Sequence, residues 1–225
     1  MNGSLYLAGG GSARQEQRVW RAAFRGVQRV VHWPFALPDD RIGGAPQWLR
    51  TSLAELDIEV RVDVWFSLDG HRPAELAGTD LLFVSGGTTS KLARHVHRHG
   101  FDRAVRDHVA AGGRYYGGSA GAVLAGESIA IVALADDDAD ATTDDRGLGL
   151  LPTLAVLPHA DTVGVERQHA WSTALGRPLL AVPEAGGVHV TGTTCTVLGP
   201  DPVHVVDGAG RVTYLPGDRI PLDGQ

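Results

Sequence analysis

The chain has 225 residues and a formal net charge of −6, and 43% of its residues are hydrophobic. This length and hydrophobic content suffice for one α/β domain with a buried core, and we expect residues 1–225 to form a single domain. The acidic balance argues against a nucleic-acid-binding surface, which would be basic. The single cysteine, Cys195, excludes an intrachain disulfide and a cysteine-based zinc site.

The sequence also contains no stretch that approaches the ~18 apolar residues of a membrane-spanning helix. Its first residues lack the basic segment and long apolar run of a secretory signal peptide. We therefore expect a cytoplasmic protein without a membrane partner.

Strands and helices alternate through the first half of the chain. Apolar or alternating runs predict strands at residues 4–8, 27–31, 59–65 and 80–84, and amphipathic runs predict helices at residues 14–24, 47–56, 91–98 and 101–111. This alternation predicts a parallel sheet with helices on both faces, in which ligands bind at the carboxyl ends of the strands. The glycine-rich turns at residues 9–11, 86–90 and 117–122 should therefore share one edge of the sheet.

Three glycines, Gly9, Gly10 and Gly11, follow the first predicted strand and suggest a phosphate-binding loop. However, Arg14 occupies the place of the third glycine of the dinucleotide fingerprint, and no Gly-Lys-Ser/Thr sequence follows. An ordinary turn between strand and helix is the preferred interpretation.

The sequence Gly117-Gly118-Ser119-Ala120-Gly121 follows an extended run and precedes a segment of small residues. It matches the nucleophile-elbow pattern, in which a serine is held on a tight turn between a strand and a helix. The flanking glycines allow the close approach that this turn requires. The alternative is an ordinary glycine-rich turn with an N-capping serine.

In the second half, apolar runs predict strands at residues 128–132, 154–157 and 179–182, with a helix at residues 165–175. The acidic run at residues 136–145 is expected to be a solvated loop, with cation binding or a catalytic carboxylate as alternatives. From Gly187 onward, short β-like runs alternate with turns and predict closing hairpins.

A serine nucleophile needs a base, and the base needs an orienting acceptor. Of the ten histidines, His159 directly follows a buried predicted strand, so it should reach the same edge as Ser119. Glu184 follows the next predicted strand and should reach that edge as well. His95 and His99 share a helix face without an adjacent acidic or cysteine partner in the sequence, which favours an exposed polar face over a metal site.

Several segments together resemble the successive motifs of the peptidase E (aspartyl dipeptidase) family, to which the cyanophycinases are related. These are Val84-Ser85-Gly86-Gly87-Thr88-Thr89, Gly117-Gly118-Ser119-Ala120-Gly121-Ala122, Leu157-Pro158-His159 and Val182-Pro183-Glu184-Ala185-Gly186. The resemblance implies a flavodoxin-like α/β fold related to class I glutamine amidotransferases, with serine in place of their cysteine. It further implies a serine peptidase with Ser119 as nucleophile, His159 as base and Glu184 as orienting acid.

The resemblance also implies contacts around the nucleophile. The backbone N–H groups of Gly87 and Ala120 would form the oxyanion hole, and Gly86 and Thr88 would contact substrate. Arg167 is the nearest candidate to meet a substrate carboxylate. The expected partner is a small peptide, with Asp-Xaa as one substrate class. A homodimer is compatible with the family, and no metal or other cofactor is implied.

This sequence departs from the family pattern at Thr88, where the family usually has asparagine, and at Gly118, where it usually has an aromatic residue. The chain between His159 and Glu184 is also shorter than in the aspartyl dipeptidases. Asp136, Asp137 or Asp138 competes with Glu184 as the acid, since the family's loop after the elbow also carries acidic residues. One alternative function is a peptide-tailoring or acidic-polymer hydrolase of the same fold without Asp-Xaa activity. Another is a catalytically degenerate member that binds a small ligand.

Overall fold

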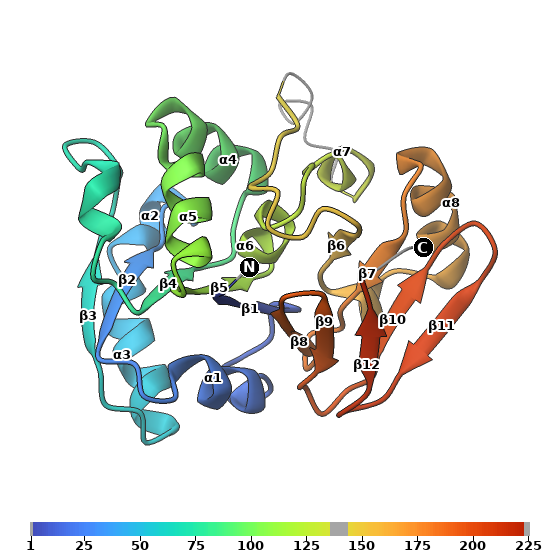
Figure 1. The fold of residues 1–225 in the computed structure, drawn as a ribbon, viewed down its shortest axis with the longest axis horizontal. Coiled ribbons are helices and arrows are strands. Elements are labelled where there is room, and N and C mark those ends of the chain that lie inside the picture. Colours follow the sequence, from blue (N-terminus) through green and yellow to red (C-terminus); the bar gives the residue numbers. More distant parts are fainter. Residues whose placement is uncertain (1, 136–143, 223–225) are drawn as a thin grey trace.

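A computed structural model describes residues 2–135 and 144–222, and its larger sheet has eight strands in the order β12-β9-β8-β1-β5-β4-β2-β3 (Figure 1). Five strands form its parallel part: β1 (Ser4–Ala8), β2 (Arg29–Trp33), β3 (Arg61–Val64), β4 (Leu81–Val84) and β5 (Arg114–Gly118). Three antiparallel strands extend it beyond β1: β8 (Gly187–Thr191), β9 (Thr194–Val197) and β12 (Arg219–Pro221). The mostly parallel sheet predicted from the sequence is confirmed.

Helices cover both faces of this sheet, as Figure 1 shows. One face carries α1 (Gln17–Phe24) and α3 (Ala45–Glu55); the other carries α4 (Thr89–Arg98), α5 (Phe101–Ala110) and α6 (Ala120–Leu124). Side chains alternate along each strand, so Tyr6 and Ala8 of β1 pack with α1 and α3. Leu5 and Leu7 point to the opposite face and join the core under α4 and α5. The helices predicted on both faces of the sheet are therefore present.

A second, four-stranded sheet has the order β11-β10-β7-β6. It contains β6 (Ala155–Leu157), β7 (Leu179–Ala181), β10 (Val203–Val206) and β11 (Arg211–Tyr214), and only β6 and β7 are parallel. We expected residues 154–157 and 179–182 to end at the edge of the main sheet, and this was wrong. The free edge of β1 is taken by antiparallel β8, so β6 and β7 pair with each other instead.

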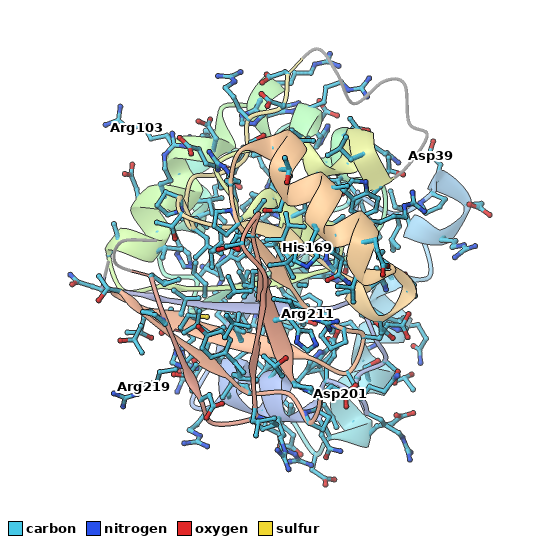
Figure 2. All side chains as sticks on the ribbon, turned by 90° about the vertical axis from the view of Figure 1, so that its right-hand side faces the viewer. Asp39, Arg103, His169, Asp201, Arg211 and Arg219 are labelled. Atoms are coloured by element: carbon cyan, nitrogen blue, oxygen red, sulfur yellow. The ribbon has the colours of Figure 1, made fainter. Side chains whose placement is uncertain are left out.

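The end of the molecule built on the second sheet faces the viewer in Figure 2, with His169 labelled on α8 (Val165–Leu175) and Arg211 on β11. His169 Nδ1 lies 2.8 Å from the carbonyl oxygen of Asp207, which follows β10. This contact links the helix to the turn of the β10–β11 hairpin. The hairpins expected after residue 187 are confirmed, since β8 with β9 and β10 with β11 form antiparallel pairs.

The strand predicted at residues 128–132 is wrong. Ser128 makes only an isolated bridge with Arg146, and the following residues form the short helix α7 (Ile131–Ala135). Ile131 and Val132 are buried in the core. A short continuous apolar run fits a buried helix as well as a buried strand, so the sequence pattern alone does not distinguish the two.

The remaining helix, α2 (Asp39–Ile42), is short, and the longest described helices, α3 and α8, each have 11 residues. Within residues 2–135 and 144–222, the structure has no helix whose length and apolar character suit a membrane crossing.

Strand β2 lies two residues later than predicted, and this places His32 inside the strand rather than in a loop. The side chain is fully buried, and its Nε2 lies 2.6 Å from the hydroxyl oxygen of Ser85. Its Nδ1 finds no hydrogen-bond partner among the described residues. Burial lowers the pKa of His32 from 6.5 to about 3, because the protonated imidazole would lose its hydration.

His32 should make the protein acid-sensitive. Because its folded pKa lies below that of the unfolded chain, the unfolded state binds more protons between about pH 3 and 6.5, and stability is lost as the pH falls. We expect this group alone to lower the free energy of unfolding by about 2 kcal/mol from pH 7 to pH 5. In His32→Leu, urea denaturation should show a loss smaller by that amount. Equal losses in both proteins would contradict the burial argument, and His97→Leu controls for removing an imidazole outside the core.

Candidate active site

Ser119 occupies a tight turn between β5 and α6, as the elbow pattern predicts. Its backbone has φ 49° and ψ −112°, a conformation that costs a non-glycine residue on the order of 1–3 kcal/mol. A Cβ atom on Gly117 would lie 2.4 Å from the carbonyl oxygen of Gly121, and one on Gly121 would lie 2.6 Å from that of Val84. Glycine is therefore required on both sides of the serine.

A chain of hydrogen bonds starts at this serine. Ser119 Oγ lies 2.9 Å from His159 Nε2, and His159 Nδ1 lies 3.2 Å from Glu184 Oε1. The histidine and glutamate side chains are 37% and 41% exposed, and Ser119 is half-buried. Solvent and small molecules can thus reach the three side chains. The imidazole can accept the serine proton through Nε2 while the carboxylate accepts the Nδ1–H.

His159 and Glu184 come from the second sheet, although Ser119 comes from the main one. His159 follows β6, and its backbone N–H donates to the carbonyl oxygen of Gly9 at 3.0 Å. Glu184 follows β7, and its N–H donates to the carboxylate of Asp161 at 3.0 Å. The Ser119 N–H donates to Ala8 at 3.1 Å. The end of β1 therefore holds the backbones of both Ser119 and His159.

The triple-glycine turn (residues 9–11) packs against all three of these side chains or their backbones. A Cβ on Gly10 would lie 2.6 Å from His159 Nε2 and 2.9 Å from Ser119 Cβ. A Cβ on Gly11 would lie 2.5 Å from the carbonyl oxygen of Glu184, and one on Gly9 would lie 1.9 Å from that of Pro183. No side chain fits at these positions, which explains the three consecutive glycines.

The amides of this turn already bind an anion that belongs to the protein. The buried carboxylate of Glu16 accepts the N–H groups of Gly10 and Gly11 at 2.8 and 2.9 Å, together with Tyr116 Oη–H and the Trp20 indole N–H. Burial raises the pKa of Glu16, and these four donors oppose the rise. Because Glu16 occupies the site where a phosphate would bind, the structure favours the plain-turn interpretation.

The loop after β4 reaches the nucleophile from the other side. A Cβ on Gly86 would lie 3.0 Å from Ser119 Cβ. Gly87 has φ +136°, and its Cβ would lie 2.2 Å from the carbonyl oxygen of Ala36, which also accepts the N–H of Thr88 at 2.8 Å. Ala120 begins α6 directly after the nucleophile. Turns 9–11, 86–90 and 117–122 thus meet at one place, as expected, and the oxyanion-donor and substrate-contact roles stay predictions.

Of the remaining predicted site residues, only the arginine lies in the part of the chain that the structure describes. Arg167 is exposed on α8, and its guanidinium lies 4.9 Å from the centre of the Trp171 ring. Asp136, Asp137 and Asp138, the competing acids, lie outside the described residues. Later in the same acidic run, the Arg146 guanidinium beside Asp144 holds the pKa of that carboxyl well below its usual range.

His95 and His99 have an acidic neighbour that the sequence did not reveal. His95 and His99 lack an acidic partner nearby in the sequence, yet the fold brings Asp69 to them, and one ligand-type atom of each side chain lies within 4.8 Å of the others. Asp69 Oδ1 lies 2.8 Å from His99 Nε2, and the Leu68 N–H donates to His95 Nε2 at 2.9 Å. These hydrogen bonds account for the cluster. No sequence signal indicated it, because Asp69 lies in a loop far from α4 along the chain.

The close contacts of Gly10 lead to a direct test. Gly10→Ala should push the imidazole of His159 away from Ser119 Oγ, and it should slow the reaction of Ser119 with a fluorophosphonate at least ~10²-fold. Gly26→Ala is the matched control, because Gly26 also has a positive φ but has no atom within 4 Å of the added Cβ. Both variants carry the same type of backbone strain, because each places a side chain at a positive φ. Equal labelling rates in the two variants would refute the steric argument.

The Glu16 contacts predict a large effect on stability. Glu16→Ala removes the acceptor for two amides, a phenol and an indole, so we expect the free energy of unfolding to fall by about 3–5 kcal/mol. Glu55→Ala provides the control, because Glu55 pairs with Arg14 at the surface and its loss should cost at most about 1 kcal/mol. Urea denaturation measures both. Similar losses would show that the Glu16 network stabilises little.

Comparison with known proteins adds independent evidence. An uncharacterized peptidase of Listeria innocua is 34% identical over 113 residues, which cover 49% of this chain and 51% of that protein. An uncharacterized peptidase of Pasteurella multocida is 34% identical over 87 residues, covering 38% and 42%. The chain spans about half the length, or less, of the curated relatives it matches.

Two solved structures share the fold. The crystal structure of a peptidase from an acI-B1 Actinobacterium aligns with a TM-score of 0.74 and 19% identity, covering 98% of this chain and 97% of the other. A putative peptidase E protein from Listeria monocytogenes EGD-e aligns with a TM-score of 0.72 and 22% identity, covering 88% and 99%. The model of peptidase family S51 matches residues 9–198, so the chain belongs to peptidase family S51, the peptidase E family.

Proposed function

We propose that this protein is a serine peptidase that hydrolyses the amide bond of a dipeptide or short peptide through an acyl-enzyme on Ser119. The observation that carries the proposal is the hydrogen-bond chain from Ser119 Oγ through His159 to Glu184, at 2.9 and 3.2 Å. The family and the peptidase names of the relatives support a serine-type peptidase. The strained elbow supports it as well, because such strain is typical of functional positions.

In this mechanism, Ser119 Oγ attacks the scissile carbonyl carbon while His159 Nε2 accepts the hydroxyl proton. Glu184 stays ionised and holds the Nδ1–H, which stabilises the imidazolium. The N–H groups of Gly87 and Ala120 would stabilise the oxyanion. The imidazolium then protonates the leaving amine, and water releases the acyl group by the reverse proton transfers. No step requires a metal.

The Asp-Xaa preference has weaker support than the triad. It depends on a cation that meets a substrate carboxylate, and Arg167 is the residue that we expected in that role. The Arg167 guanidinium lies over the Trp171 ring rather than beside a residue of the Ser119–His159–Glu184 chain. We therefore propose peptide hydrolysis without assigning a preference for aspartate.

Replacing the nucleophile tests the proposal. Ser119→Ala should lower kcat/KM on any cleaved dipeptide by at least ~10³-fold and abolish fluorophosphonate labelling, because the attacking oxygen is lost. The measurement is turnover against a dipeptide panel that includes Asp-Xaa substrates. Rapid labelling of wild type without cleavage of the panel would restrict the substrate class. Absence of both labelling and cleavage would favour a ligand-binding protein.

The orienting acid can be tested separately. Glu184→Gln should lower kcat by about 10²–10⁴-fold, because the amide no longer holds the imidazolium by charge. Glu166→Gln, at an exposed carboxylate on α8, is the control and should retain wild-type kcat. Asp136→Asn tests the competing assignment. A large loss in Asp136→Asn with normal turnover in Glu184→Gln would assign the role to Asp136.

A further inference from the structure

A pocket of about 470 Å³ opens beside the nucleophile. Its lining comes from α2, α3, the loop before α2 and the loop after β4, which supplies Ser85 and Gly86. This volume lies in the range of small-molecule binding sites, ~300–1,000 Å³. A larger cavity, of about 780 Å³, lies between α3 and edge strand β3, and its lining includes no residue of the loop after β4.

Gly86 connects the smaller pocket to Ser119. A Cβ at Gly86 would lie 3.0 Å from Ser119 Cβ and 3.6 Å from Ser119 Oγ, so Gly86 borders both the nucleophile and the pocket. A peptide whose carbonyl carbon sits at Ser119 Oγ has its neighbouring side chain only a few bonds away. Because Gly86 borders both Ser119 and the pocket, that side chain ends close to the pocket lining.

The pocket walls are mainly apolar. Leu37, Ala45 and Trp48 line them, and Trp48 is 45% exposed, an unusual state for the largest apolar side chain. The Trp48 ring packs edge-on against Trp20, with 6.0 Å between ring centres, so a neighbouring side chain supports it in place. The hydroxyl of Ser85 is already paired with His32 inside the protein. These walls offer a substrate contact area rather than hydrogen bonds.

The rim carries two opposite charges. Asp40 and Arg41 are adjacent residues of α2, and both are exposed at the pocket. A charged substrate side chain would meet a group of like sign together with one of opposite sign. The rim therefore gives little net preference for either charge, and the apolar walls disfavour burying one.

We propose that this pocket, which we call the Trp48 pocket, binds an uncharged aromatic or large aliphatic side chain of the peptide residue next to the scissile bond. The inference rests on the proposed peptidase activity of Ser119. It differs from the Asp-Xaa expectation, because it assigns selectivity to an apolar surface and not to a cation. Trp48 and Leu37 are the specificity-determining residues.

The test compares kcat/KM for the dipeptides Phe-Ala, Ala-Phe, Leu-Ala, Ala-Ala, Asp-Ala and Lys-Ala. We expect a substrate with Phe or Leu to exceed Ala-Ala, Asp-Ala and Lys-Ala at least tenfold. In Trp48→Ala, the ratio of the best Phe substrate to Ala-Ala should fall at least tenfold. Phe66→Ala is the matched control, because Phe66 is 46% exposed and lies outside the pocket lining, and it should keep the wild-type ratio.

A second variant protects the test if Trp48→Ala does not fold. Gly44 lines the pocket with φ −81°, and an added Cβ would have only an ordinary 3.5 Å contact, with Arg41 O. Gly44→Leu should therefore fold and narrow the pocket, and it should lower the ratio of Phe to Ala substrates at least fivefold. Unchanged ratios of Phe to Ala substrates in both variants would overturn the pocket assignment. Faster wild-type cleavage of Asp-Ala than of the Phe and Leu substrates would overturn it as well.

Fluorophosphonate labelling separates the two proposals. Rapid labelling of Ser119 with no preference for large apolar residues would reject the Trp48 pocket and retain the peptidase. If Ser119 reacts with neither the fluorophosphonate nor any dipeptide, the peptidase proposal itself fails and the pocket assignment falls with it.

Discussion

The close approach of the triple-glycine turn (residues 9–11) to the Ser119–His159 pair is the constraint on which the site depends. Gly10 leaves no room for a methyl group between the turn and either side chain, and the carbonyl oxygen of Gly9 holds the backbone of His159. Glu16 fixes the turn from the core side through two amides. A buried carboxylate is costly, but its four donors offset part of this cost and rigidify the loop. The turn thus serves as an internal support rather than as a ligand site.

The site also requires two sheets to meet. Ser119 ends a strand of the main sheet, whereas His159 and Glu184 follow strands of the smaller one. The position of His159 relative to Ser119 therefore depends on the contacts between the two sheets. One such contact is the backbone hydrogen bond that His159 N–H donates to the carbonyl oxygen of Gly9, directly after β1. Because the peptide backbone makes this bond, it does not depend on a particular side chain at either position.

Much of this arrangement could be predicted from sequence, because local patterns determine it. The elbow glycines identify a strand–turn–helix unit, and His159 and Glu184 directly follow short buried strands. The expectation that these strands join the main sheet was wrong. Strand β8 pairs with β1 instead, and strand patterns in the sequence do not determine which strands pair in the folded protein. The strand predicted at residues 128–132 was wrong for a related reason. Burial of Ile131 fits a helix as well as a strand, and only its neighbours in the fold distinguish the two. Asp69 lies near His95 only because the fold brings the two segments together, so the sequence did not indicate this contact.

The Trp48 pocket lies beyond sequence patterns for a further reason. Its walls combine residues 37–48 with residues 85 and 86, and a cavity between elements leaves no periodicity in either segment. The Ser119–His159–Glu184 chain, by contrast, needs particular residue types near strand ends, which a sequence does display. Reaction chemistry can therefore be inferred from motifs, while substrate preference depends on how α2 and α3 pack beside β4. Gly86 borders both Ser119 and the Trp48 pocket. A substitution in the α2–α3 segment can therefore alter selectivity without displacing Ser119.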